Sequence, residues 1–247
     1  MKRIDRALFE KIHMNTETIV YDYVYNNPHD KYKCALDVFE KIFVDGKVLQ
    51  KHFISKNEAV YWTKTFQYTL TGSYKSNKTS IGKCYYSNIT PTEGHKKLFC
   101  EILDCNDILF NFNNCKYVLS NCLSFPIDIN IYKQEEGSND VWIAIIFITP
   151  FSPINGGVTI KRHREFNINT TENISTEQNI QHHIMKTLKK EYCDQSLWED
   201  DIVVSSKFNR LLLIKKNLFF ATTQQFGRSL EDSRIVEMFE FSVVKKP

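Results

Sequence analysis

The sequence predicts an α+β fold that is mainly β, with an antiparallel β-sandwich body, a protruding N-terminal helix and a further amphipathic helix near residues 176–192. The stretch Val141–Pro150 (VWIAIIFITP) is apolar, β-branched and uncharged, which favours a strand buried on both faces. Short apolar runs follow Lys96 at intervals of roughly ten residues, as in a sandwich or barrel. Glycine (8) and proline (6) are scarce and no linker is evident, so residues 16–247 are expected to form one domain.

The N-terminal segment is expected to be a separate helix over residues 1–15. Its sequence MKRIDRALFEKIH carries an apolar stripe at helical spacing, with charged residues on the other faces. The residues of this stripe are Ile4, Leu8, Phe9 and Ile12.

The segments that follow predict strands. Thr18–Tyr25 alternates between aromatic and other side chains, which is typical of a strand. Asp45-Gly46 lies between two apolar runs of residues 37–53 and predicts a β-hairpin. Residues 59–70 are aromatic and β-branched and indicate a strand, with a helix left open, whereas residues 71–94 indicate mainly loop.

After Lys96, four runs predict strands ahead of the core strand: KLFCEIL, DILFNF, CKYVL and IDINIY. The core strand ends at Pro150, and Asn155-Gly156-Gly157 predicts a turn into a more polar partner strand that begins at Val158. The helix over residues 176–192 has a capping box at Ser175 and Gln178 and apolar residues at i+4 spacing. The acidic residues 199–201 indicate a turn, and the later runs IVV, RLLLI, NLFFATT and RIVEMFEFSVV return to strand character.

Charge and cysteine content narrow the classes of function. There are 32 basic and 29 acidic residues, a formal charge of +3, which excludes the strong basic field of a dedicated nucleic-acid binder. The seven cysteines lack paired spacing and are expected to be reduced, buried thiols. No apolar stretch approaches about eighteen residues, so we expect a soluble intracellular protein with no membrane partner.

No catalytic or metal-binding signature is present. The adjacent His182 and His183 point about 100° apart on a helix and cannot easily share one ion. A nucleophile from Cys84 or Cys193 with His95 or His163 stays open, but nothing in the sequence distinguishes these residues.

One basic run is a candidate for anion contact. Lys161, Arg162 and Arg164 lie in an expected strand beside Phe166, where alternate side chains would present charge to a phosphate backbone. An ordinary exposed strand face is the alternative interpretation, and the small net charge favours it.

The overall pattern resembles the polyhedrins of cypoviruses. The resemblance rests on the length, the charged helix KRIDRALFEKIH, the strand YDYVYNNP, the FVDGKVL hairpin and the β-rich remainder with IAIIF. It implies a non-enzymatic structural protein that forms homotrimers and intracellular crystals around virus particles, in occlusion bodies in the cytoplasm of the infected cell. The apolar stripe of the N-terminal helix would mediate this assembly.

The resemblance also implies that no cofactor is required and that a bound nucleotide is possible, although no residue can be assigned to it. Ionisation of tyrosines and cysteines and neutralisation of lysines above about pH 10 would dissolve such assemblies by repulsion. A viral single-stranded nucleic-acid-binding protein using the basic run, and a small hydrolase, stay open as alternatives.

Overall fold

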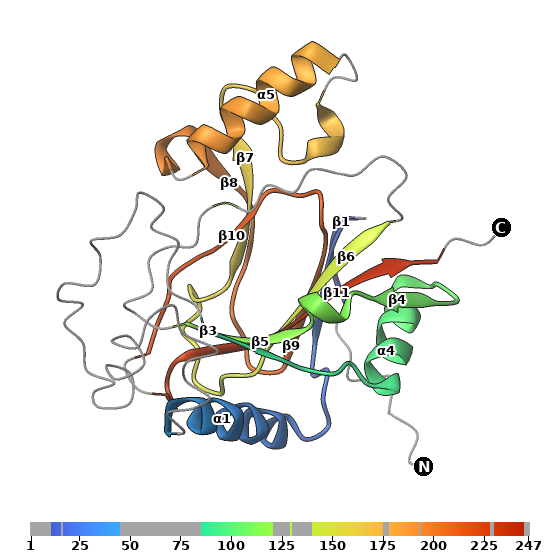
Figure 1. The fold of residues 1–247 in the computed structure, drawn as a ribbon, viewed down its shortest axis with the longest axis vertical. Helices are drawn as coiled ribbons and strands as arrows, with labels where there is room; N and C mark the ends of the chain where they lie inside the picture. The colour runs from blue at the N-terminus through green and yellow to red at the C-terminus, as the bar shows by residue number, and fades with distance from the viewer. Residues whose placement is uncertain are drawn as a thin grey trace.

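The computed structural model describes residues 11–15, 17–44, 85–120, 129, 140–174, 178–192, 194–227 and 230–244, and every structural statement refers to these residues. The described chain is mainly β, with antiparallel sheets and three α-helices (Figure 1). The helices are α1 (Pro28–Val44), α4 (Glu93–Leu103) and α5 (Gln178–Glu191). The strands are β1 (Lys11–Asn15), β2 (Thr18–Asp22), β3 (Tyr85–Asn88), β4 (Ile108–Phe110), β5 (Lys116–Ser120), β6 (Val141–Phe147), β7 (Val158–His163), β8 (Trp198–Val204), β9 (Arg210–Lys215), β10 (Phe220–Thr222) and β11 (Arg234–Val243).

The strands form two sheets. The larger has the order β1-β2-β9-β6-β11-β5-β3, with β4 paired to β11 beside this path. The smaller has the order β10-β7-β8, and all described pairs are antiparallel. Inner-face side chains of both sheets, such as Ile145 on β6 and Ile160 on β7, belong to one hydrophobic cluster, which we call the inter-sheet core. The two sheets therefore pack face to face.

Strand β6 is the centre of the molecule, as its sequence predicts. It lies between β9 and β11, and its side chains from Trp142 to Phe147 are buried. Ile143 and Ile145 enter the inter-sheet core, whereas Ala144 and Ile146 enter the cluster on the outer face of the larger sheet. Burial on both faces explains why the run is continuously apolar rather than alternating.

Helices cover the sheets on their outer sides (Figure 1). Helices α1 and α4 bury Phe39 and Phe99 in the outer cluster of the larger sheet, where Phe99 stacks on Phe241 of β11 with ring centroids 5.1 Å apart. Helix α5 confirms the prediction near residues 176–192 and packs Met185 and Leu188 in a third cluster beside the smaller sheet. In Figure 1, α1 and α5 lie at opposite ends of the molecule.

Several local predictions were wrong. Lys11–His13 belong to strand β1, paired with β2, rather than to an N-terminal helix, and residues 1–10 lie outside the described residues. The first arm of the expected hairpin at Asp45-Gly46 is the end of α1. The run KLFCEIL is helix α4, and the acidic residues 199–201 lie within β8 instead of a turn.

Other predictions were confirmed or lie outside the described residues. Strand β2 confirms most of the Thr18–Tyr25 prediction, and β5 and β7 to β11 match runs that predict strands. Residues 59–70 lie outside the described residues, as does the run IDINIY apart from Ile129. The division into residues 1–15 and a single domain over residues 16–247 stays a prediction.

Candidate functional site

The inter-sheet core is aliphatic along most of its length and polar at one end. This polar end is formed where β5, β6 and β10 finish and where β7 and β11 begin. Arg234 pairs with Ser120 across β11 and β5, so their side chains lie on the same, inner face of the larger sheet. We define the polar end by five buried residues: Ser120, Thr149, Gln225, Ser233 and Arg234.

Arg234 is the unusual member of this group, because its side chain is among the largest that are fully buried. A guanidinium is rarely buried this completely unless polar groups contact it. Its Nε donates to the backbone carbonyl oxygen of Gly156 (3.2 Å), and its central carbon lies 5.7 Å from the centroid of the Phe147 ring. The strand alternation of β11 places this cation between the two sheets, beside the aliphatic core.

The other members of the polar end are neutral hydrogen-bonding groups. The Ser120 hydroxyl donates to Oε1 of Gln225 (2.5 Å), and Nε2 of Gln225 donates to the hydroxyl of Thr222 on β10 (2.8 Å). Thr149 Oγ1 accepts from the backbone N–H of Ile235 (2.8 Å). These contacts join both sheets at the polar end. Chemically, a guanidinium with hydroxyl and amide neighbours suits the recognition of a carboxylate.

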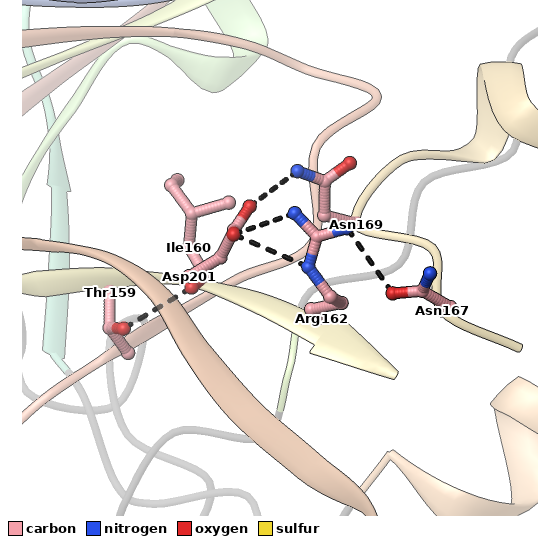
Figure 2. A network of polar contacts seen from close by, with 6 residues as sticks. All are labelled: Thr159, Ile160, Arg162, Asn167, Asn169 and Asp201. Carbon is pink, nitrogen blue, oxygen red and sulfur yellow. Dashed lines mark hydrogen bonds and ion pairs between the residues drawn. The ribbon is translucent and has the colours of Figure 1, made fainter. Parts of the chain in front are cut away.

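The sequence-predicted basic run lies on β7 and the turn after it, and acidic residues of β8 face it. Nζ of Lys161 is 2.5 Å from Oδ1 of Asp200. Figure 2 shows Arg162 directed at Asp201, with Nη2 and Nε at 2.7 and 3.3 Å from Oδ1. Arg164 Nε donates to the carbonyl oxygen of Trp198 (3.4 Å). Because these contacts offset the charges of Lys161 and Arg162, the anion contact stays a prediction that the geometry does not favour.

We expect Asp201→Asn to lower the free energy of unfolding by about 1–2 kcal/mol, because Asp201 is a hub of charge-assisted hydrogen bonds. Its Oδ2 also accepts from Nδ2 of Asn169 (2.5 Å), and only 21% of its side chain is exposed (Figure 2). The matched change at Asp200, whose side chain is 54% exposed, should cost less. Urea unfolding of the two variants checks this, and equal losses would contradict the ranking.

The two buried histidines are both engaged with protein groups. His163 lies 3.1 Å through Nε2 from Oε2 of Glu191, and its Nδ1 accepts from the N–H of Phe166 (3.4 Å). This pair joins β7 to the last turn of α5. The cysteine–histidine pairs that the sequence leaves open also need Cys84 or Cys193, which lie outside the described residues, so these pairs stay untested.

His95 belongs to a second buried network, on the outer side of the larger sheet. Its Nδ1 accepts from the backbone N–H of Thr92 (3.0 Å), which leaves Nε2 to donate to Tyr25 Oη (2.9 Å). The Tyr25 hydroxyl in turn donates to the carboxylate of Glu237 on β11. Burial lowers the pKa of His95 to about 4, and burial raises the pKa of Glu237. We call these residues the Tyr25–His95–Glu237 network.

A metal centre does not fit the described part of the chain. No group of three or more His, Cys, Asp or Glu side chains there is arranged to hold an ion. The two-histidine, one-carboxylate set of non-haem iron sites needs free imidazole nitrogens. His95 and His163 instead use both ring nitrogens in contacts within the protein. His182 and His183 are exposed on α5 and also join no such group.

Sequence reasoning did not find the polar end. Arg234 opens the apolar run RIVEMFEF, and a charged residue at the inward position of a core strand was the available signal. Ser120 and Gln225 carry no signal in the sequence. Of the predicted assembly residues, Ile4, Leu8 and Phe9 lie outside the described residues, and Ile12 lies on β1. No helix within the described ranges is long and apolar enough to cross a membrane.

No family model matches the chain, and no curated protein is similar to it in sequence. The chain does resemble solved structures. One is HygX from Streptomyces hygroscopicus with nickel, 2-oxoglutarate and hygromycin B bound, at a TM-score of 0.49 and 8% identity, covering 92% of this chain and 83% of HygX. Another is AviO1 from Streptomyces viridochromogenes, at a TM-score of 0.49 and 9% identity, covering 94% and 93%.

A third similar structure is a prolyl hydroxylase from Trichoplax adhaerens in complex with a peptide of hypoxia inducible factor. Its TM-score is 0.42 at 10% identity, and the match covers 93% of this chain and 84% of the hydroxylase. At these values no site residue can be carried over to this chain.

These comparisons correct the resemblance to polyhedrins. The similar structures are of the oxygenase type that uses iron and 2-oxoglutarate, and none of those named is a polyhedrin. The predictions of a non-enzymatic occlusion protein, of self-assembly as its partner and of no required cofactor were therefore wrong, as was the nucleic-acid alternative. The helical Phe43-Val44 and the strand at Lys11–His13 explain the error, because the resemblance rested on a hairpin and a helix there. The intracellular location stays a prediction.

Proposed function

We propose that this protein is an enzyme that binds a small 2-oxo acid at the polar end of the inter-sheet core, with Arg234 as the anchor of its carboxylate. The observation that carries the proposal is the complete burial of the Arg234 guanidinium between the two sheets. Burying a cation away from water is costly, and proteins retain such groups where they recognise an anion or organise a site.

The strand order supports an interior binding site. The chain runs from β6 in the larger sheet to the β7–β8 pair in the smaller sheet and returns to β9, which lies beside β6. Strand β10 then lies beside β7, and β11 beside β6. This nested order is that of a jelly roll, and we propose that architecture for the body of the protein. The ends of such two-sheet interiors are common places for small-molecule sites.

The surroundings of Arg234 favour a carboxylate over a larger polyanion. A planar guanidinium binds a carboxylate through two parallel hydrogen bonds. The hydroxyl of Ser120 and the amide of Gln225 are neutral groups that can orient the remaining oxygens of a small acid. The apolar core beside them, including Val236 and Phe147, excludes water and strengthens the ionic contact.

Two other buried charges of the larger sheet are carboxylates that accept hydrogen bonds from cationic side chains. Asp22 accepts from Arg210 at 2.6 and 3.1 Å and from Lys207 at 2.6 Å. Glu240 accepts from Lys216 at 2.9 Å and from two asparagine amides. Such carboxylate-centred clusters stabilise the fold and offer no cation to a ligand.

Titration calorimetry with 2-oxoglutarate tests the proposal, since that acid is bound in one of the similar structures. We expect saturable binding to the wild-type protein and about 10- to 100-fold weaker binding to Arg234→Met, because a charge-assisted hydrogen bond is lost. Arg164→Met is the matched control, because Arg164 is exposed and lies outside the polar end. Ser120→Ala, which keeps the charge, should weaken binding by a smaller factor.

Circular dichroism of each variant separates loss of binding from loss of folding. Equal affinity of the wild-type protein and a folded Arg234→Met variant would overturn the site. Consumption of the bound acid, followed by NMR, is expected of an enzyme. Binding without any consumption would contradict the enzymatic part of the proposal.

A further inference from the structure

Two cysteines lie side by side at the C-terminal end of α4. The helix ends at Asp104, which adopts the left-handed conformation (φ 49°, ψ 47°). The backbone N–H groups of Asp104 and Cys105 both donate to the carbonyl oxygen of Cys100, at 3.0 Å for Cys105. The bond from Cys105 is the 6→1 hydrogen bond of a Schellman motif, and the bond from Asp104 is the 5→1 hydrogen bond of the αL motif. In such C-terminal caps the residue after the left-handed position packs against the last turn of the helix. The motif therefore brings Cys105 back onto Cys100.

The two thiols are in contact and reduced. The thiol of Cys105 is hydrogen bonded to Cys100, and both residues are free and only partly buried. Both also pack against the outer cluster beneath α4. The other described cysteines differ, since Cys34 is exposed on α1 and Cys115 is buried and donates to the carbonyl oxygen of Asn111 (3.3 Å).

We infer that Cys100 and Cys105 are a reversible oxidation site that closes into an intramolecular disulfide when the protein meets a peroxide. The backbone turn already holds the two residues within reach, so a disulfide demands little rearrangement. The sulfur of Cys100 attacks a peroxide oxygen and becomes a sulfenic acid, while the O–O bond breaks. The sulfur of Cys105 then attacks that of Cys100 and expels water. In sum, two thiols and one hydrogen peroxide give one disulfide and two waters.

The charges around the pair distinguish the two roles. Burial and the neighbouring Cys100 raise the pKa of Cys105 to about 11, so Cys105 stays protonated at neutral pH and serves as the hydrogen-bond donor. Lys96 lies one turn before Cys100 on α4 and interacts with it electrostatically, and Lys96 Nζ also pairs with Asp107 (2.6 Å). Because Cys105 stays protonated, we assign Cys100 as the attacking sulfur and Cys105 as the resolving one.

The test exposes the folded, reduced protein to hydrogen peroxide, alkylates the remaining thiols after unfolding, and locates the modified residues by mass spectrometry. Cleavage after Lys97, Glu101 and Lys116 places Cys100 and Cys105 on different peptides. We expect these two peptides to become joined, to lose both alkylation sites, and to separate again on reduction with dithiothreitol. The exposed Cys34 reports that the peroxide has reached the protein.

Two variants make the result specific. In Cys105→Ser the joined peptides should be absent, and a sulfenic acid at Cys100 should accumulate and be trapped by dimedone. Cys34→Ser should behave as the wild-type protein. The inference fails if Cys100 and Cys105 stay fully alkylated at a peroxide dose that oxidises Cys34. It also fails if Cys100 in the wild-type protein is over-oxidised while Cys105 stays a free thiol.

Discussion

Gly157→Ala is expected to lower the free energy of unfolding by at least about 3 kcal/mol, because no space exists for a methyl group at this position. An added Cβ would lie 1.8 Å from the carbonyl oxygen of Val204 and 2.8 Å from the backbone nitrogen of Ser206. Both are backbone atoms that cannot turn aside as a flexible side chain would. Val158 and Val204 are paired directly beyond this contact, so β7 and β8 would have to separate at one end of the smaller sheet.

Gly94→Ala is the matched control, since it makes the same chemical change where the added methyl group meets only an ordinary van der Waals contact. Gly94 lies in the first turn of α4, and the nearest atom to an added Cβ is Oγ1 of Thr92 at 3.4 Å. Alanine has the higher helix propensity, so stability should be unchanged or slightly raised. Urea unfolding followed by circular dichroism compares the two variants. Similar transition midpoints for Gly157→Ala and the wild-type protein would contradict the close approach of β7 and β8.

The strands of the core could be predicted because their burial leaves a direct pattern in the sequence. Strand β6 is apolar at successive positions because both of its faces are covered. A short, continuously apolar and β-branched run of this kind indicates a buried strand. Helix α5 lies over one side of the smaller sheet, so its apolar stripe recurs at helical spacing. In both cases one local pattern determines the element.

The sequence did not predict helices α1 and α4, because local patterns in both segments also fitted strands. In α1, Ala35 and Phe39 are buried at i+4 spacing, but the Asp45-Gly46 pair after the helix indicated a hairpin. In α4, the run KLFCEIL is too short to separate strand from helix by periodicity. The deciding features were the cap at Thr92 and the burial of Phe99 and Ile102 at i+3 spacing. Tertiary packing, rather than propensity, determined both elements.

The candidate site could not be predicted because strand pairing brings it together. Ser120 and Arg234 meet only because β5 and β11 are neighbours, and Gln225 reaches Ser120 from the segment after β10. The interpretation of Lys161 and Arg162 as anion contacts had the same weakness. Their carboxylate partners lie on β8, beyond the long connection that contains α5. Whether a charged side chain on a strand is free to bind a ligand cannot be predicted until the residues of the neighbouring strand are known.

Acid should destabilise the wild-type protein through His95. The pKa of this residue falls from 6.5 in the unfolded chain to about 4 in the folded protein, because burial and then the cation of Lys31 disfavour the imidazolium. Between pH 6.5 and about 4, His95 is therefore protonated in the unfolded state and neutral in the folded state. The corresponding stability is complete above pH 6.5 and is lost as the pH falls through about 4. The loss amounts to about 3 kcal/mol.

His95→Gln should remove this pH dependence and keep the local structure. His95 is the third residue of α4 and forms a capping box with Thr92, a position at which glutamine makes the same backbone contact. The glutamine amide also keeps a donor for Tyr25. A neutral amide does not titrate, so the free energy of unfolding of this variant should lack the step between pH 6.5 and 4.

The pH dependence of the wild-type protein alone does not isolate His95, because Glu237 in the same network changes the free energy of unfolding in the opposite direction. Burial raises the pKa of Glu237, so the folded state binds its proton more readily and gains stability as the pH falls. Tyr25, which contacts both residues, transmits hydrogen bonds but stays protonated over this range, since burial raises its pKa. Subtracting the variant curve from the wild-type curve removes the contribution of Glu237 and of the surface carboxylates.

Urea unfolding at intervals from pH 7.5 to pH 4 gives the two curves. We expect the difference in free energy of unfolding between the wild-type protein and His95→Gln to be constant above pH 6.5. By pH 4 the wild-type protein should have lost about 3 kcal/mol relative to the variant. Parallel curves over the whole range would mean that His95 titrates normally in the folded protein. In that case the imidazole would reach solvent, and the hydrogen bonds from Thr92 to His95 and from His95 to Tyr25 would not hold it in the neutral form.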